Sequence, residues 1–128
     1  NDYQLGTTKV FLKKHIYGSL VLSGDKEIKL LNKKFRNKNK STDVLSFPFH
    51  EKRNLSKILK KEKDIYLGDI IINFNKIKNK ESLKNFKLAF DNLWVHGLVH
   101  LFGYDHKNKK DFIKMQKIES KFLKFIND

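Results

Sequence analysis

A dense apolar segment at residues 83–102 places the strongest constraint on how this chain can fold. Its Phe, Leu, Val and Trp residues cover most of a helix's circumference, so the segment predicts a helix that other elements bury. A chain of 128 residues is long enough for one hydrophobic core but too short for two. We therefore expect a single domain over residues 1–128, with this helix at its centre.

Three shorter segments predict strands. Residues 17–23 predict a buried strand, and residues 67–72 predict a second one. Residues 44–49 are β-branched and aromatic, and Pro48 places this third strand at or near a sheet edge.

Apolar periodicity predicts the other helices. One is expected to start at Ser23-Gly24-Asp25, and a last helix follows Gly103, which sits where a left-handed cap belongs. The expected apolar stripes are Ile28, Leu31 and Phe35 on the first of these, and Phe112, Met115, Ile118, Phe122 and Phe125 on the last. Residues 51–64, nine of them charged, predict a mobile surface loop or a marginal helix. The predicted fold is α+β, a small mixed sheet of three to four strands packed with about four to five helices around one buried helix.

Three of the five histidines lie within eleven residues of one another. On a helix, His96 and His100 share one face with side chains about 5–6 Å apart, which a single metal ion can bridge. Gly103 lets the chain turn back, so that His106 can supply a third nitrogen. Three protein ligands leave a fourth position open, as in catalytic zinc sites. We therefore expect one Zn2+ per chain, held by His96, His100 and His106.

A histidine on an apolar helix is more often a satisfied core residue than a metal ligand. Two histidines among Leu, Val, Trp and Phe, however, would each need a buried polar partner, and one metal ion satisfies both. We interpret His15 and His50 as ordinary loop histidines. The spacing also matches the HExxHxxGxxH zinc proteases, but Gly97 stands where those enzymes carry their glutamate base. Peptide hydrolysis is therefore disfavoured, unless a carboxylate such as Asp69 or Asp105 substitutes.

Composition restricts the class of protein further. The chain has no cysteine, which excludes disulfides and thiolate metal sites. No apolar run approaches the length of a membrane span, so we expect a cytoplasmic protein without a membrane partner. The formal charge of +14 comes from 26 lysines and two arginines. It fits either an RNA-binding surface or a solvated lysine surface.

Four motifs of the sequence resemble those of a known protein family. HGLVHLFGYDH at residues 96–106, STDVLSFP at 41–48, LGDI at 67–70 and LNKKFR at 31–36 closely resemble the YbeY family of bacterial endoribonucleases. The resemblance implies a single-strand-specific metalloendoribonuclease that acts in 16S rRNA 3′-end maturation and in late-stage 70S ribosome quality control. Its implied partners are single-stranded RNA, ribosomal RNA and the small ribosomal subunit. The family usually begins with a further strand, which we expect to be missing before Asp2.

The same resemblance assigns the site. His96, His100 and His106 match the family's zinc ligands, and Arg36 matches its arginine implicated in catalysis, so we expect catalysis to depend on Arg36 and His96. Zinc stabilises charge on a phosphoryl oxygen or activates water, and the planar guanidinium of Arg36 suits phosphate oxygens. Two alternatives remain open: a zinc peptidase, and a non-catalytic RNA-binding ribosome-assembly factor with a structural zinc. The roles of Asp69 and Asp105 and the oligomeric state stay undetermined.

Overall fold

The central element is β3, Asp64–Asn73, which has a strand on each side in this computed structural model. The structure describes residues 15–78 and 81–127. The sheet order is β1-β3-β2, with β1 (His15–Ser23) parallel and β2 (Val44–Pro48) antiparallel to β3. The helices are α1 (Asp25–Arg36), α2 (Lys52–Lys61), the short η2 (Phe74–Lys76), α3 (Leu83–Leu101) and α4 (Lys109–Asn127). Three strands and four α-helices confirm the predicted α+β class.

The two outer strands differ from each other in how well the sequence predicted them. The prediction that β2 lies at a sheet edge is confirmed. The prediction that β1 is buried is wrong, because its Tyr17, Leu20, Val21 and Leu22 are 44% to 55% exposed. Among the described residues β1 pairs with β3 alone, so it is also an edge strand. The expected loss of an N-terminal strand concerns residues outside the described ones.

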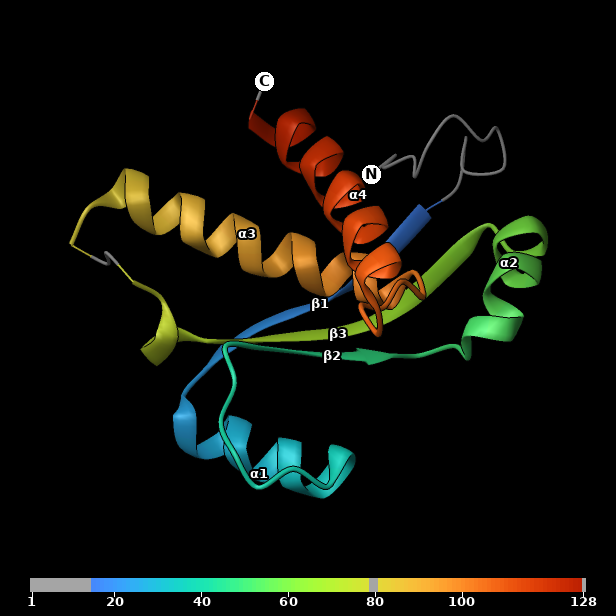
Figure 1. Ribbon diagram of the computed structural model, residues 1–128. Helices are drawn as coiled ribbons and strands as arrows, with labels where there is room; N and C mark the ends of the chain where they lie inside the picture. Colours follow the sequence, from blue (N-terminus) through green and yellow to red (C-terminus); the bar gives the residue numbers. More distant parts are fainter. Residues whose placement is uncertain (1–14, 79–80, 128) are drawn as a thin grey trace.

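Helices cover the sheet unequally on its two faces. In Figure 1, α3 and α4 lie on one side of the sheet and α1 lies on the other. The second half of α3 packs on the sheet, and Met115 and Phe122 of α4 pack on Val95 and Val99. The predicted burial of the whole helix is not confirmed, since Leu83 in its first turn is 84% exposed. None of the described helices is long and apolar enough to cross a membrane.

The apolar stripes predicted on the first and last helices are only partly buried. Ile28 is fully buried, but Phe35, in the last turn of α1, is 59% exposed. On α4, Phe112 and Phe125 are 49% and 66% exposed, whereas Met115 and Phe122 pack on α3. The segment at residues 51–64 contains a real helix, α2, whose Leu55 and Leu59 join the core.

A buried asparagine ties α1 to the sheet. The side chain of Asn73 is fully buried and donates to the Asp25 carboxylate (2.5 Å), the Ser41 hydroxyl (3.0 Å) and the Thr42 carbonyl (3.1 Å). The Asn75 side chain accepts the backbone N–H of Asp25 at 3.0 Å, so a residue fifty positions away caps the predicted helix start. These bonds satisfy a polar group that would otherwise destabilise the core.

The distance between α3 and the sheet is set at Gly97. A Cβ added there would lie 2.7 Å from Cγ2 of Ile70 and 3.1 Å from Oγ of Ser46. The Ser46 hydroxyl donates to the Gly97 carbonyl at 3.0 Å, so the helix backbone itself is bonded to β2. Glycine is therefore required at position 97 for this close approach.

We predict that Gly97→Ala destabilises the protein by about 1–3 kcal/mol, because the added methyl group overpacks a tight contact. Urea unfolding followed by circular dichroism measures this loss. Asn92→Ala, at an exposed position of the same helix, is the control and should unfold at or slightly above the wild-type midpoint. Equal stability of the Gly97→Ala and wild-type proteins would contradict this account of the helix position.

Candidate metal centre

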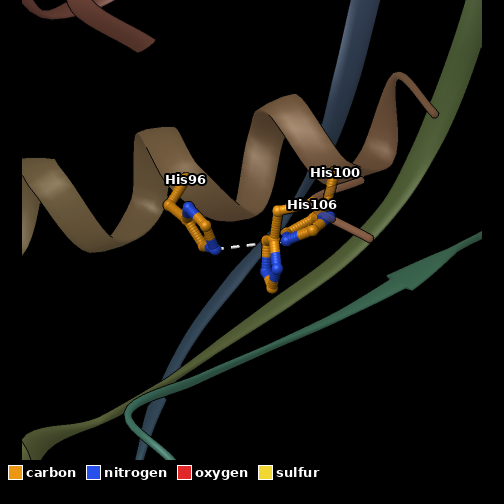
Figure 2. A group of neighbouring side chains, drawn as sticks. All are labelled: His96, His100 and His106. Atoms are coloured by element: carbon orange, nitrogen blue, oxygen red, sulfur yellow. Dashed lines mark hydrogen bonds between the residues drawn. The ribbon is translucent and has the colours of Figure 1, made fainter. Parts of the chain in front are cut away.

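The structure brings the three predicted histidines together. His96 and His100 project from the same face of α3, and Gly103, with a φ of 96°, turns the chain so that His106 returns to them. Figure 2 shows the three imidazoles converging on one side of the helix. The Nε2 atoms of His96 and His100 are 3.1 Å apart, and one nitrogen from each of the three rings lies within 4.8 Å of the others.

Two of these imidazoles are oriented by bonds to their outer nitrogens. Nδ1 of His100 lies 2.8 Å from the carbonyl of Tyr104, and Nδ1 of His96 lies 3.2 Å from Oε2 of Glu119 on α4. A carbonyl or a carboxylate only accepts hydrogen bonds, so each Nδ1 carries the proton. Each Nε2 then presents a lone pair to the shared space, as in metal-ligating histidines that donate their other N–H to an oxygen.

The space between the two Nε2 atoms suits a cation. Two lone pairs 3.1 Å apart repel each other unless a proton or a metal ion lies between them. Burial, together with the neighbouring His96, lowers the pKa of His100, which disfavours the proton near neutral pH. Two imidazole ligands of a tetrahedral zinc ion lie about 3.4 Å apart, given Zn–N bonds of about 2.0–2.1 Å. The residues therefore fit a metal ion.

Asp105 stabilises the turn that carries the third histidine. Its Oδ1 accepts the backbone N–H of His106 at 2.8 Å. Burial alone would raise the pKa of Asp105, but this bond and the charges of His100 and His106 outweigh it and lower the pKa. Asp105 therefore caps the turn that precedes His106.

Asp69 does not take the place of the missing protease glutamate. Position 97 faces the sheet, where a side chain would collide with Ile70. Because Ile70 points toward α3, its neighbour Asp69 points to the opposite face of β3, where its carboxylate accepts a hydrogen bond from the Tyr66 hydroxyl. The substitution of Asp69 for the base is therefore contradicted by its position.

Arg36 is placed beside β2 rather than within the histidine group. Its Nη2 donates to the Ser46 carbonyl at 2.5 Å, and its Cζ lies 5.7 Å from the ring centre of Phe47. Since the Ser46 hydroxyl bonds to Gly97, one strand residue links Arg36 to the helix turn that carries His96.

The two remaining histidines lie apart from the group. His15 is in β1 rather than in a loop and pairs with Asp64 at 3.2 Å. His50 follows β2 and meets Phe49 edge to face, with ring centroids 5.0 Å apart.

Glu119 is the site residue that sequence reasoning missed. It lies four residues after Met115 and three before Phe122, so it shares the buried face of α4. A carboxylate on the apolar face of a lysine-rich helix was the available signal, because such a group needs a buried partner.

We predict that purified protein carries about one zinc per chain and that His100→Ala abolishes binding. Glu119→Ala should weaken zinc binding about 10–100-fold without unfolding the chain, the scale for losing the partner of a ligating histidine. Chelator competition measures the affinities. Gln116→Ala, at an exposed position of the same helix, is the control. Wild-type affinity in the Glu119→Ala protein would contradict this role.

The chain is similar to several known proteins. A family model described as endoribonuclease YbeY matches residues 4–127. An endoribonuclease YbeY of Pelagibacter ubique is 49% identical, over 91% of this chain and 73% of the relative. One of Buchnera aphidicola from Schizaphis graminum is 43% identical, over 80% and 62%. A solution structure of TM1509 from Thermotoga maritima is 29% identical with a TM-score of 0.44, over 81% of this chain and 66% of that one. The chain thus spans between about three fifths and three quarters of the length of these two curated relatives.

The match of the family model over nearly the whole chain shows that the chain belongs to the YbeY family of endoribonucleases.

Proposed function

We propose that this chain is a zinc-dependent endoribonuclease specific for single-stranded RNA. The observation that carries the proposal is the pair of imidazoles whose outer nitrogens are already bonded and whose inner nitrogens face each other 3.1 Å apart. A ligand set made only of imidazoles favours zinc over magnesium or calcium, which prefer oxygen ligands. Among the described residues the group has three members, the number typical of a catalytic zinc site.

The residues around the site have different roles in the proposed phosphodiester cleavage. His96, His100 and His106 hold the metal, and Glu119 makes His96 a stronger ligand by accepting its N–H. Zinc bound in such a site acts as a Lewis acid and lowers the pKa of coordinated water to roughly 7.

Arg36 supplies the second positive charge. Ser46 and Phe47 hold its guanidinium in place, and among the described residues its other N–H groups have no hydrogen-bond partner. They are thus available to the equatorial oxygens of a phosphate, where negative charge grows during cleavage. We therefore assign catalysis to His96 and Arg36.

The proposed cellular role follows the family. We place the activity in the cytoplasm, in maturation of the 16S rRNA 3′ end and in quality control of 70S ribosomes, with ribosomal RNA and the small subunit as partners. The charge of +14 supports a polyanionic substrate. We also propose that residues 1–128 form one domain.

The cleavage assay compares single-stranded RNA, double-stranded RNA and casein, each with zinc and with a chelator. We expect cleavage of single-stranded RNA alone, and its loss in the chelator. Casein cleavage would favour the peptidase instead. RNA binding without cleavage, in protein loaded with zinc, would favour an assembly factor with a structural metal.

We predict that Arg36→Ala slows single-turnover cleavage of single-stranded RNA by about a hundredfold or more, while zinc content is unchanged. Arg36→Lys should recover little activity, because a point charge lacks the planar fork. The melting temperature of each variant is recorded, because the alanine variant also loses the bond to Ser46. The matched control is Arg53→Ala, which removes an exposed arginine paired with Glu51 and should cleave normally. Wild-type cleavage by both Arg36 variants would remove Arg36 from the mechanism.

A further inference from the structure

Five aromatic residues lie on or beside the face of the sheet that points away from α3. Tyr17 and Tyr66 meet with ring centroids 5.4 Å apart, and Phe49 lies 5.6 Å from Tyr66. Phe35, near the end of α1, lies 5.5 Å from Phe47 of β2. We call these five residues the aromatic platform.

Strand alternation assigns the platform to this face. Ser46 and Ile70 lie against Gly97 of α3, so the residue that follows Ser46, Phe47, and the residue that precedes Ile70, Asp69, point to the opposite face. The same alternation separates the platform from the metal centre by the thickness of the sheet.

The two tyrosines lie on the same face as Asp69. The Tyr66 hydroxyl bonds to the Asp69 carboxylate and lies 2.6 Å from the Ser19 hydroxyl, and Tyr17 packs on the Tyr66 ring. In Figure 1, α1 lies beneath the end of the sheet at which β1 finishes, and α2 lies beside the other end. The tyrosines are at that other end, because they occupy the first residues of β1 and β3.

The platform leaves apolar rings open to solvent. Tyr17, Phe35 and Phe49 are 55%, 59% and 68% exposed. Single exposed aromatic residues are common on protein surfaces. Here the rings form two contacting groups on one face, one of three rings and one of two, and such clustering is typical of interaction sites.

The charges beside the rings identify the kind of partner. Nζ of Lys34 lies 5.2 Å from the ring centre of Phe35, and Cζ of Arg36 lies 5.7 Å from that of Phe47. Lysine is depleted at protein–protein interfaces, whereas exposed rings flanked by cations are typical of surfaces that stack unpaired bases. The complementary partner is therefore a polyanion with aromatic faces.

We propose that the aromatic platform stacks unpaired bases of the RNA substrate, on the far side of β2 from the metal centre. The proposal rests on the proposed function and extends it to a second binding site. Because the Asp69 carboxylate repels phosphates, the RNA backbone runs along Lys34 and Arg36 while the bases lie over the rings. Arg36, bonded to the outer carbonyl of β2, lies where the chain passes from one site to the other.

The test is equilibrium binding of a fluorescent twelve-nucleotide single-stranded RNA to the zinc-loaded protein, with phosphorothioate linkages and 2′-O-methyl riboses in the probe so that it is not consumed. Phe49→Ala and Tyr17→Ala should each weaken binding about tenfold, the scale for losing one stacked base. Phe49→Trp should retain affinity and Phe49→Leu should not, because stacking needs an aromatic face rather than apolar area alone. An RNA lacking bases at the stacked positions should bind more weakly and should be insensitive to Phe49→Ala.

The matched control is Phe125→Ala, which removes a similarly exposed phenylalanine near the end of α4 and should bind RNA normally. RNA binding that is equal in the wild type and all platform variants would overturn the platform and leave the nuclease proposal intact. Loss of RNA binding by the wild type itself would overturn both. If Phe49→Ala instead turns a dimer into a monomer in sedimentation, with RNA affinity unchanged, the face joins two copies of the chain and the proposal is wrong.

Discussion

The contact between the backbone of α3 and the sheet at Gly97 is the constraint on which the rest of the structure depends. A helix that approaches this closely has little freedom to rotate, because Ile70 and the Ser46 hydroxyl meet its backbone directly. In this orientation of α3, position 97 faces the sheet. His96 and His100 are thereby presented beside the sheet, where His106 can reach them. A glutamate at position 97 is incompatible with this packing, so the contact that orients the histidines leaves no room there for the base that the zinc proteases carry.

The strand β2 connects the two faces of the molecule. The Ser46 hydroxyl donates a hydrogen bond to α3, and the Ser46 carbonyl accepts one from Arg36. The ring of the next residue, Phe47, lies against the Arg36 guanidinium. A strand can serve both faces because successive side chains alternate and an edge strand keeps unpaired carbonyls. The histidine-bearing helix α3 and Arg36 of α1 therefore lie on opposite faces of the sheet, and Ser46 of β2 bonds to both helices.

The described fold leaves much apolar surface exposed, and its distribution is uneven. On β1, which pairs on one side only among the described residues, Leu20, Val21 and Leu22 are about half exposed. The rings of the aromatic platform are exposed for a different reason, since α1 covers only one end of its face. Cations lie over two of those rings and give that surface a polar rim, which the exposed part of β1 lacks among the contacts described.

The sequence by itself determined what depends on near neighbours. Periodicity located three strands and the long helices, Pro48 indicated the edge strand, and the i, i+4 spacing of His96 and His100 with Gly103 predicted the metal ligands. The tertiary structure decided what depends on residues far apart in the chain. It brought Glu119 to His96 and Asn75 to the start of α1. It also left β1 and Phe35 exposed to solvent. Local patterns specify which face of an element is apolar. Which group bonds to a polar atom, and whether an aromatic side chain is buried, depend on how whole elements pack.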